Sequence, residues 1–330
     1  MNAPFPQRIA GEGRRDVAGR PILCVGALIA DLVMYMAKLP VTPGKHLPAG
    51  AQLVVAGMAT SAATAVLRLG HPASLWASVG DDVIGSLLLG EMAREGLDMR
   101  HVRRVPGAMS AMSTILVDDR GERLVVPYYA DELLTAPSAL PPFADFGAVL
   151  VDVRWPRAAA IALRQARAFG VPAILDLDVG REEILRELLP LATHVVASID
   201  GARIVTGHDE PGAAARAISA ATHAAIVVTA GERGAVWMEH AGAPLGHCPA
   251  FEVAAVDTNA AGDVFHGAFA VGVAENMPFA DVIRFSSAAA AIKCTRYGGR
   301  LGAPARAEVD AFLSEREILK ARDDHELRPV

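Results

Sequence analysis

A run of small and acidic residues near the C-terminal end of the chain has the composition of an anion-binding catalytic loop. It reads Asp-Thr-Asn-Ala-Ala-Gly-Asp over residues 257–263, and the following VFHGAFAVGVA predicts an amphipathic helix. Unpaired backbone N–H groups at a helix start, together with the helix dipole, favour a bound anion. Asp263, in the first turn, would stand beside that anion. This pairing suits phosphoryl transfer, in which N–H donors hold the transferred group and a carboxylate accepts the proton of the attacking hydroxyl.

On spacing alone, the simpler interpretation of Asp263 is a helix cap, because Asp and Gly are ordinary capping residues. Other polar residues follow directly after apolar runs that predict buried strands, among them Asp31, Arg154 and Thr229. Ligands bind beyond the carboxyl ends of the strands in an open α/β sheet, so we expect these residues at one edge. Arg154 presents a planar fork that suits sulfonate, phosphate or carboxylate oxygens, and Lys45 would add a second positive charge. The alternative is that both are ordinary surface residues.

The elements that must position these residues alternate along the chain. Short apolar runs predict buried strands at 22–29, 74–79, 148–153, 173–177, 195–197 and 225–229. Helical patterns separate them at 57–69, 84–95, 157–169, 182–189 and 213–221. Strand–helix–strand repetition with right-handed crossovers predicts an α/β fold, a doubly wound and mostly parallel sheet flanked by helices.

Two regions break this alternation and predict a small β lid. Residues 46–55 mix apolar and polar positions, and 114–117 with 123–128 flank a turn at 118–121 that is typical of a β-hairpin. We expect the lid to be formed by about 32–56 and 112–130, within one domain at 21–316. A disordered tail at 1–20 and a polar tail at 317–330 would flank that domain. Exposed apolar lid strands are a liability unless paired, which predicts a homodimer joined through the lids.

Composition excludes several classes of protein. The 330 residues are 52% hydrophobic, which excludes a disordered chain, and a formal net charge of −6 argues against a nucleic-acid partner. No uninterrupted apolar stretch reaches the roughly 18 residues that span a bilayer, so we expect no membrane partner. Three scattered cysteines predict neither a disulfide framework nor a zinc site, and the N-terminal segment lacks the apolar core of a signal peptide. Together these features predict a cytoplasmic protein.

The loop at 257–263 resembles the D-T-x-G-A-G-D signature of the ribokinase-like, PfkB-type carbohydrate kinases and differs from it by Ala260 in place of the first Gly. Further segments resemble blocks of that family in the family's order: CVGALIAD ending in Asp31, AGMATSAATAVLRLG, SVGDDVIGSLLLGEMAREGLDM and VVTAGERGAVW. The resemblance extends from about residue 21 to 315. It implies a ribokinase-like fold, with ATP as phosphoryl donor and Mg²⁺ on the nucleotide phosphates.

The resemblance also implies roles for particular residues. Asp263 matches the catalytic base, and the backbone of Ala260, Ala261, Gly262 and Asp263 matches the anion hole. The sugar would be bound by Asp31, Lys45, Gly57, Ser61 and Arg154. The nucleotide would be bound by Thr229, Gly231, Gly234 and Lys293. The resemblance assigns no metal ligands in this chain.

Within the family, the segments PGKHLPA, AATAV, VDVRW, DVFHGA and KCTRYGGRLGAP resemble the 6-deoxy-6-sulfofructose kinases. This likeness implies phosphorylation of a primary hydroxyl on an anionic ketose, with 6-deoxy-6-sulfofructose at C1 as the leading candidate. Fructose, a sugar phosphate or a sugar acid are alternatives. A catalytically weakened, sugar-binding regulator on the kinase scaffold is another, although a regulator would have no need of a general base.

Four departures from the family pattern bear on the site. Ser61 stands where the family has a sugar-binding Asn, Pro127 replaces an Asn of the lid strand, and Ser198 begins the segment that is commonly Asn-x-x-Glu. Ala260 has less backbone freedom than Gly, and we expect it to be tolerated only with a negative φ. His266 lies one turn beyond Asp263, where packing or a hydrogen bond within the protein is the expected role.

Overall fold

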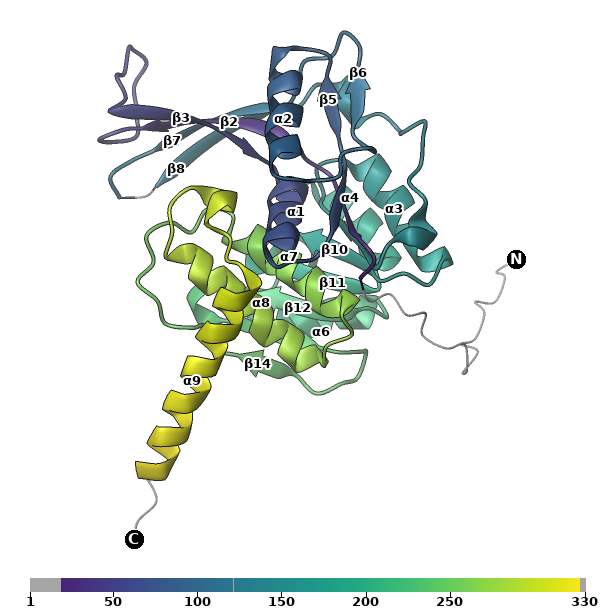
Figure 1. The fold of residues 1–330 in the computed structure, drawn as a ribbon, viewed down its shortest axis with the longest axis vertical. Helices are drawn as coiled ribbons and strands as arrows, with labels where there is room; N and C mark the ends of the chain where they lie inside the picture. Colours follow the sequence, from purple (N-terminus) through teal and green to yellow (C-terminus); the bar gives the residue numbers. More distant parts are fainter. Residues whose placement is uncertain (1–18, 121, 327–330) are drawn as a thin grey trace.

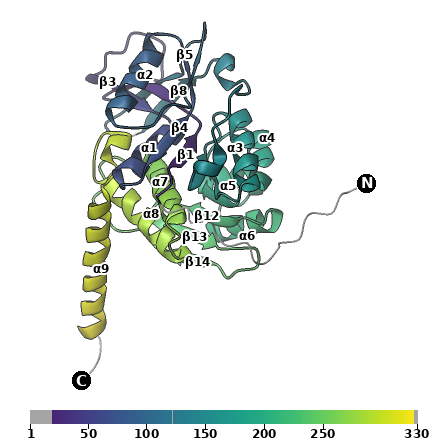
Figure 2. The same ribbon diagram turned by 45° about the vertical axis from the view of Figure 1, so that its right-hand side comes forward.

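The computed structural model describes residues 19–120 and 122–326, with side chains described as far as Arg316. Its centre is an eight-stranded sheet, parallel except for β13 and β14, with both faces covered by helices (Figures 1 and 2). The spatial order of the strands is β14 (Gly246–Cys248), β13 (Ala235–Met238), β12 (Ala225–Thr229), β11 (His194–Ser198), β10 (Ala173–Leu177), β9 (Ala148–Val151), β1 (Ile22–Val25) and β4 (Ala73–Trp76). The predicted mostly parallel sheet is confirmed.

The helices form two layers because each buried strand offers alternate side chains to opposite faces. Ile22 and Cys24 of β1 pack into the core beneath α1, α7 and α8, whereas Leu23 and Val25 pack into the core beneath α3 to α6. The helices are α1 (Met58–Arg68), α2 (Val83–Arg94), α3 (Pro156–Ala168), α4 (Glu182–Leu188), α5 (Ile199–Thr206), α6 (Pro211–Ala221), α7 (Ala261–Ala274), α8 (Phe279–Cys294) and α9 (Arg306–Glu326). Short 3₁₀ turns are η1 (Asp131–Leu134), η2 (Phe143–Asp145), η3 (Leu189–Leu191), η4 (Gly231–Arg233) and η5 (Gly299–Gly302).

Two of the predicted strands are interrupted within the apolar runs that predict them. The run at 22–29 breaks at Gly26, where φ is 148° and a Cβ would lie 2.1 Å from the carboxyl group of Asp152. The run at 74–79 divides into β4 and β5 (Ser78–Gly80), and β5 leaves the central sheet to pair with β6 (Arg103–Val105). In both cases a continuous apolar run concealed a change of direction.

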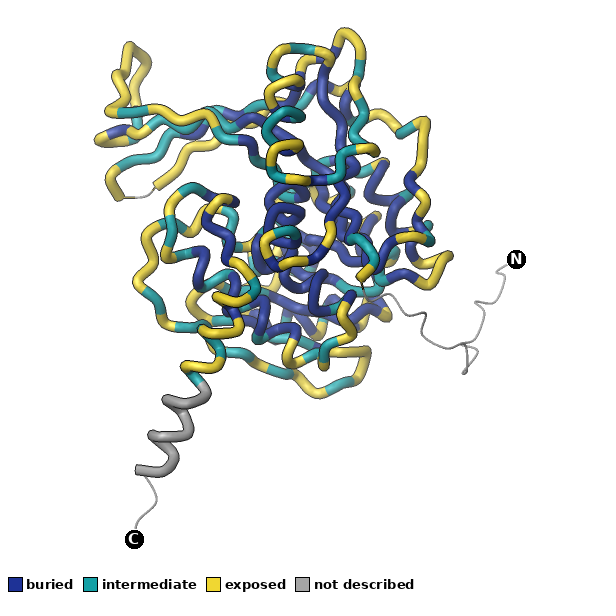
Figure 3. Tube along the Cα trace, viewed as in Figure 1, coloured by how far each residue is buried: buried dark blue, intermediate teal, exposed yellow. Residues whose placement is uncertain are grey.

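The segments expected to form the lid make a separate four-stranded sheet that projects from one end of the central sheet (Figure 1). Its order is β3 (Gly50–Ala56), β2 (Ile29–Tyr35), β7 (Met112–Val117) and β8 (Arg123–Tyr128). The inner pair β2 and β7 is parallel, and the other two pairs are antiparallel. Every residue of the edge strand β8 is exposed (Figure 3).

The segment at 317–330 is predicted from its sequence as a polar tail, but helix α9 continues through it as far as Glu326 and extends away from the body (Figure 2). Residues 1–18 of the expected N-terminal tail lie outside the described residues. Within the described part of the chain, none of the helices has both the length and the apolar content to cross a membrane.

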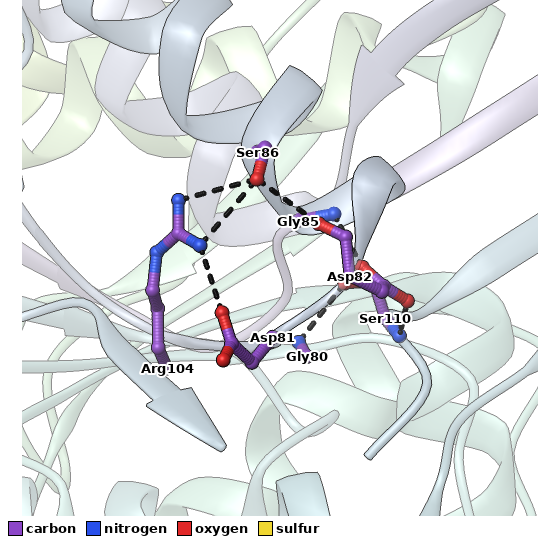
Figure 4. A network of polar contacts seen from close by, with 7 residues as sticks. All are labelled: Gly80, Asp81, Asp82, Gly85, Ser86, Arg104 and Ser110. Carbon is purple, nitrogen blue, oxygen red and sulfur yellow. Dashed lines mark hydrogen bonds and ion pairs between the residues drawn. The ribbon is translucent and has the colours of Figure 1, made fainter. Parts of the chain in front are cut away.

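A polar network around Asp82 fixes the start of α2 (Figure 4). One carboxylate oxygen of Asp82 accepts hydrogen bonds from Gly85 N and Ser110 Oγ, both at 2.6 Å, and the other accepts from Ser110 N at 2.8 Å. Desolvation acts to raise the pKa of Asp82, but the hydrogen bonds together outweigh it, so the pKa lies below its ordinary value. A Cβ at Gly85 would lie 2.2 Å from the carbonyl oxygen of Gly80. The block Gly80-Asp81-Asp82-Val83-Ile84-Gly85 therefore acts within the fold, as a helix cap with close backbone packing.

Candidate active site

The carboxyl ends of the central strands meet the N-termini of α1 and α7 at one edge of the sheet. Asp152 follows β9, Asp178 follows β10, and Ser198 ends β11. From the helix side, Ser61 in the first turn of α1 donates a side-chain hydrogen bond to Asp263 in the first turn of α7. The structure thus brings the predicted base to the sheet edge at which open α/β proteins bind ligands.

The backbone at the start of α7 is strained and partly unpaired. Ala260 has φ 60° and ψ 11°, in the left-handed region, so the expectation of a negative φ is wrong. The N–H of Ala261 donates to Thr258 O at 3.2 Å, and this turn reverses the chain before α7 begins. Ala260 lies within the turn and therefore adopts the left-handed conformation. Among the described residues, the N–H groups of Gly262 and Asp263 have no hydrogen-bond partner. These two donors are the free part of the predicted anion hole.

Gly262 is a glycine that the rest of the protein does not require. It is exposed, its φ is not positive, and no described atom lies within 4 Å of a Cβ built on it. A helix interior normally favours Ala over Gly by roughly 0.5–1 kcal/mol. Space kept open beside two free N–H donors is the arrangement of a helix-terminus anion site.

The electrostatics of Asp263 suit a general base. Desolvation by burial raises its pKa well above the ordinary value, and the negative charges of Asp176 and Asp178 raise it further. The hydrogen bond from Ser61 and the nearby His266 ring act in the opposite direction. A carboxylate with a raised pKa has greater affinity for a proton, which favours proton abstraction from an alcohol.

The predicted sugar-binding residues on the lid and at the start of α1 differ in their surroundings. Asp31 on β2 is half-buried and accepts a hydrogen bond from Ser113 Oγ at 2.6 Å, while its burial raises its pKa. Gly57 caps α1 with φ 117°, and a Cβ there would lie 2.3 Å from Ala27 O, so its glycine is needed by the fold. Lys45 is exposed in the loop between β2 and β3. Ser61 is buried and contacts Asp263, which makes it a neighbour of the predicted base.

Arg154 lines a small pocket between the root of the lid and the sheet edge, together with Ala27, Ala111 and Tyr129. Its backbone N–H donates to Asp152 Oδ1 at 2.8 Å, but among the described residues its guanidinium has no hydrogen bond or ion pair. The opposite lining includes Tyr129, whose pKa burial raises to about 12, so its hydroxyl keeps its proton. A half-buried guanidinium whose N–H donors are free of described protein acceptors, beside a neutral phenol, can donate to an anionic ligand.

The predicted nucleotide residues lie at the end of β12 and in the turn that follows. Thr229 Oγ1 donates to Ala197 O at 3.3 Å. Gly231 has φ 55°, and Gly234 has φ 79° with a Cβ position only 2.1 Å from Cys248 O. The turn at 231–234 thus needs both glycines for its own geometry. Lys293 is fully buried and donates to Asp257 O at 2.6 Å.

Sequence reasoning missed two aspartates that organise the site. The buried Asp152 accepts from Ala27 N at 2.8 Å and Ala59 N at 3.1 Å, tying the strand edge to the start of α1. Asp178 accepts from Ser198 Oγ at 2.8 Å, and that same hydroxyl caps α5 by accepting from Gly201 N. The position of each aspartate directly after an apolar strand was the available signal.

The buried His266 contacts atoms of the protein on two neighbouring strands. Its Nε2 lies 3.2 Å from Val196 O and 3.3 Å from Asp176 Oδ1, and burial lowers its pKa. The carbonyl oxygen can only accept, so Nε2 carries a hydrogen. These contacts agree with the expected packing role.

Magnesium carried by nucleotide phosphates needs only one or two protein carboxylates. In the described part of the chain, no three His, Cys, Asp or Glu side chains are grouped as a metal site. Asp178, which is half-buried after β10 and whose charge acts on Asp263, is the carboxylate at this edge that fits such a limited role, whereas Asp176 is buried beside His266. The side chains at this edge therefore suit an Mg²⁺ ion that is held mainly by nucleotide phosphates, and they do not form a site in which the described protein residues alone coordinate the metal.

Comparisons with known proteins agree on one family. The sequence profile described as pfkB family carbohydrate kinase matches residues 20–306. A ribokinase from Haemophilus influenzae is 29% identical over 89% of this chain and 98% of its own length. The crystal structure of a candidate ribokinase from Agrobacterium tumefaciens is 45% identical, with a TM-score of 0.87 over 91% of this chain and 99% of that one. Ribokinase from Arabidopsis thaliana, solved with ribose and ATP, shares the fold, with 21% identity and a TM-score of 0.79 over 89% of this chain and 99% of its own.

Proposed function

The chain belongs to the pfkB family of carbohydrate kinases, and from that premise we propose that it phosphorylates a primary hydroxyl of an anionic ketose. The enzyme is an ATP-dependent carbohydrate kinase. The leading candidate substrate is 6-deoxy-6-sulfofructose, converted to its 1-phosphate. This choice rests on the sequence segments that resemble the sulfofructose kinases and on one structural observation, the unpartnered guanidinium of Arg154 in the pocket.

In the proposed reaction, Asp263 removes the proton of the primary hydroxyl while the hydroxyl oxygen attacks the γ-phosphorus. The bond from that phosphorus to the bridging oxygen breaks, and ADP leaves. The free N–H groups of Gly262 and Asp263, at the positive end of α7, would bind the oxygens of the transferred group. Bound Mg²⁺ would neutralise part of the phosphate charge. Thr229, Gly231 and Gly234 are the proposed nucleotide contacts.

Arg154 in the pocket and Asp31 on the lid strand β2 suit the two ends of such a substrate. Asp31, held by Ser113, offers carboxylate oxygens that accept hydrogen bonds from sugar hydroxyls. Arg154 offers a planar pair of N–H donors to a sulfonate. Lys45 would add its charge if the loop between β2 and β3 moves toward the pocket on binding. A half-buried guanidinium that makes no hydrogen bond or ion pair within the described chain favours an anionic sugar over a neutral one by charge-assisted hydrogen bonds.

Turnover of ATP across a panel of sugars tests this proposal. The panel contains 6-deoxy-6-sulfofructose, fructose 6-phosphate, fructose and ribose, and the variants are Arg154→Ala and, as a control, Arg157→Ala on the exposed side of α3. We expect Arg154→Ala to raise KM for the sulfonated sugar by about 10- to 100-fold, the value of one charged hydrogen bond. KM for fructose should not change. Equal effects on charged and neutral sugars would refute an anionic substrate.

A neutral pentose is the second candidate, because the relatives named ribokinase match nearly the whole chain. Pro127 on β8 also lacks the side-chain amide that the sulfofructose kinases have in that strand. If this reading holds, ribose gives the highest kcat/KM of the panel and Arg154→Ala leaves it unchanged.

The proposed homodimer would form through the lid of a cytoplasmic enzyme. The edge strand β8 exposes Leu124, Val125, Val126 and Tyr128. No described strand pairs with the backbone N–H and C=O groups on its outer side. Pairing with a second lid would cover both. Light scattering should give twice the mass of one chain, and Val126→Glu should reduce it to a single chain.

A further inference from the structure

A buried lysine lies directly behind the loop at 257–263. Lys293 is in the last turn of α8, and its side chain is completely buried. Its ammonium donates to the carbonyl oxygen of Asp257 at 2.6 Å and lies 3.2 Å from Oδ2 of the same residue. A buried ammonium is costly unless it is paired and hydrogen-bonded. Asp257 supplies both requirements, so the two residues are held together.

Asp257 also makes hydrogen bonds to three other parts of the chain. Its Oδ1 accepts from Asn259 N at 2.8 Å, which folds the loop back on itself. Its Oδ2 accepts from Gly298 N at 3.1 Å and Gly299 N at 3.2 Å, in the turn that follows α8. Its own N–H donates to Cys294 O at the end of α8. The start of the loop is therefore fixed to the end of α8 by several bonds that all pass through one residue.

The electrostatics and packing of Lys293 agree with a fixed position. Burial lowers the pKa of Lys293, and the charge and hydrogen bond of Asp257 act against that shift. The methylene chain is covered by η5, where a Cβ on Gly302 would lie 3.4 Å from Lys293 Cε. A cation held between a carboxylate and a helix C-terminus is electrostatically favoured on both sides.

The other end of the loop carries backbone strain. Ala260 is in the left-handed region three residues after Asp257, and its carbonyl oxygen accepts the first helical bond of α7 from Val264 N at 2.9 Å. Non-glycine residues remain in such conformations only when their surroundings hold them there. The Lys293–Asp257 pair provides that hold three residues before the strained residue.

We propose that Lys293 is a positioning residue: acting through Asp257, its ammonium fixes the 257–263 loop so that Gly262 N–H and Asp263 face the transferred phosphoryl group. This role differs from the direct nucleotide contact predicted from the sequence, because the ammonium is directed at Asp257. It rests on the proposed phosphoryl transfer. A loop misplaced by about 1 Å costs on the order of 100-fold in rate.

Kinetics of Lys293→Met, Asp257→Asn and the double variant test this role, with Arg186→Met at an exposed position of α4 as the control. We expect Lys293→Met to lower kcat by about 100-fold, with little change in KM for ATP. The double variant should be no slower than the slower single variant, because the residues act as one unit. A raised KM for ATP at unchanged kcat would instead establish a direct nucleotide contact and overturn the proposal, as would additive losses.

Hydrogen exchange gives a readout that needs no turnover. In Lys293→Met, the hydrogen-bonded N–H groups of Asp257, Asn259, Ala261 and Val264 should exchange faster than in the wild-type enzyme, while those of α3 and α4 should not change. Unchanged exchange in the loop would overturn the positioning role even if activity falls. If the wild-type enzyme turned over none of the sugars, the proposed function would be refuted. Hydrogen exchange would still decide whether Lys293 holds the loop in position. If Lys293→Met does not fold, Lys293→Arg, which keeps the charge and changes its geometry, is measured in the same way.

Discussion

The starts of α2 and α7 contain the same kinds of residue, an Asp and a Gly, but differ in how fully these are paired. At α2, the carboxylate of Asp82 accepts from Gly85 N, Ser110 N and Ser110 Oγ, and a Cβ on Gly85 would lie 2.2 Å from a backbone oxygen. At α7, the N–H groups of Gly262 and Asp263 have no partner among the described residues, and a Cβ on Gly262 would meet open space.

This difference separates a group that stabilises the fold from one that is available to a ligand. Bonds to backbone N–H groups lower the pKa of Asp82, as for a helix-capping carboxylate that is ionised in the fold. Burial and neighbouring carboxylates raise the pKa of Asp263. Two motifs that look alike in sequence therefore have opposite electrostatic character. The unsatisfied one is the candidate for chemistry.

The largest expected effect comes from removing the base at α7. Asp263→Asn should lower kcat by about 10²- to 10⁴-fold, the usual contribution of a positioned base, because the amide cannot take the hydroxyl proton. The matched control is Asp281→Asn, which removes an exposed acid from the first turn of α8 and should leave kcat unchanged. A steady-state assay of ADP release measures both. Retention of a tenth or more of the activity by Asp263→Asn would remove this residue from the mechanism.

The raised pKa of Asp263 predicts the pH dependence of the same step. The base must be ionised, so kcat/KM should fall about tenfold per pH unit below its pKa, with a midpoint above that of an ordinary Asp near 4. Asp176→Asn removes a neighbouring negative charge and should move this midpoint to lower pH. The pH–rate profiles of the wild-type enzyme and of Asp176→Asn test this prediction. An unchanged midpoint would exclude Asp176 as a cause of the raised pKa of Asp263.

The raised pKa of Asp263 also makes the stability of the folded protein depend on pH. A carboxyl group with a raised pKa in the fold favours the folded state most when protonated, and this contribution is lost as pH rises through the folded-state pKa. Asp263→Asn should therefore be at least as stable as the wild-type enzyme above that pH, and its stability should change less as pH rises.

A smaller effect is expected from the strained residue at α7. Ala260→Gly should raise the free energy of unfolding by about 1 kcal/mol, because an L-residue in the left-handed region costs roughly 1–2 kcal/mol. Asn276 also has a positive φ, of 56°, but Asn tolerates this region, so Asn276→Gly should gain less. Urea unfolding of the two variants measures the difference. Equal gains would mean that Ala260 carries no particular strain.

Much of the fold could be predicted from the sequence because buried parallel strands are continuous apolar runs. The strands at Ala173–Leu177 and Ala225–Thr229 match their predicted bounds. The breaks after Val25 and Trp76 could not be predicted, since they depend on groups distant in sequence, such as the Asp152 carboxylate beside Gly26. Helix α5 was missed because it begins directly at the end of β11, capped by Ser198.

The candidate site was predictable in its residue types and less so in its contacts. The spacing from Asp257 to Asp263 indicates an anion-binding helix start, and strand-end position indicates Arg154. No local pattern shows that Ser61 bonds to Asp263 or that Lys293 is buried against Asp257, because these pairs join segments far apart in the chain. The φ of Ala260 was predicted wrongly, since the steric preference of Ala is overridden by the tethered loop.

The measurement that tests the account most directly applies one chemical change to both helix starts. Gly85→Ala and Gly262→Ala are compared for melting temperature and for kcat/KM with ATP and the best sugar of the panel. We expect Gly85→Ala to lower the melting temperature by several degrees and to keep the turnover of its folded fraction. Gly262→Ala should melt no lower than the wild-type enzyme and lose about 100-fold or more in kcat/KM, because its methyl group would occupy the space of the phosphoryl group. Full turnover in a stable Gly262→Ala enzyme would contradict the assignment of this helix start as the phosphoryl site.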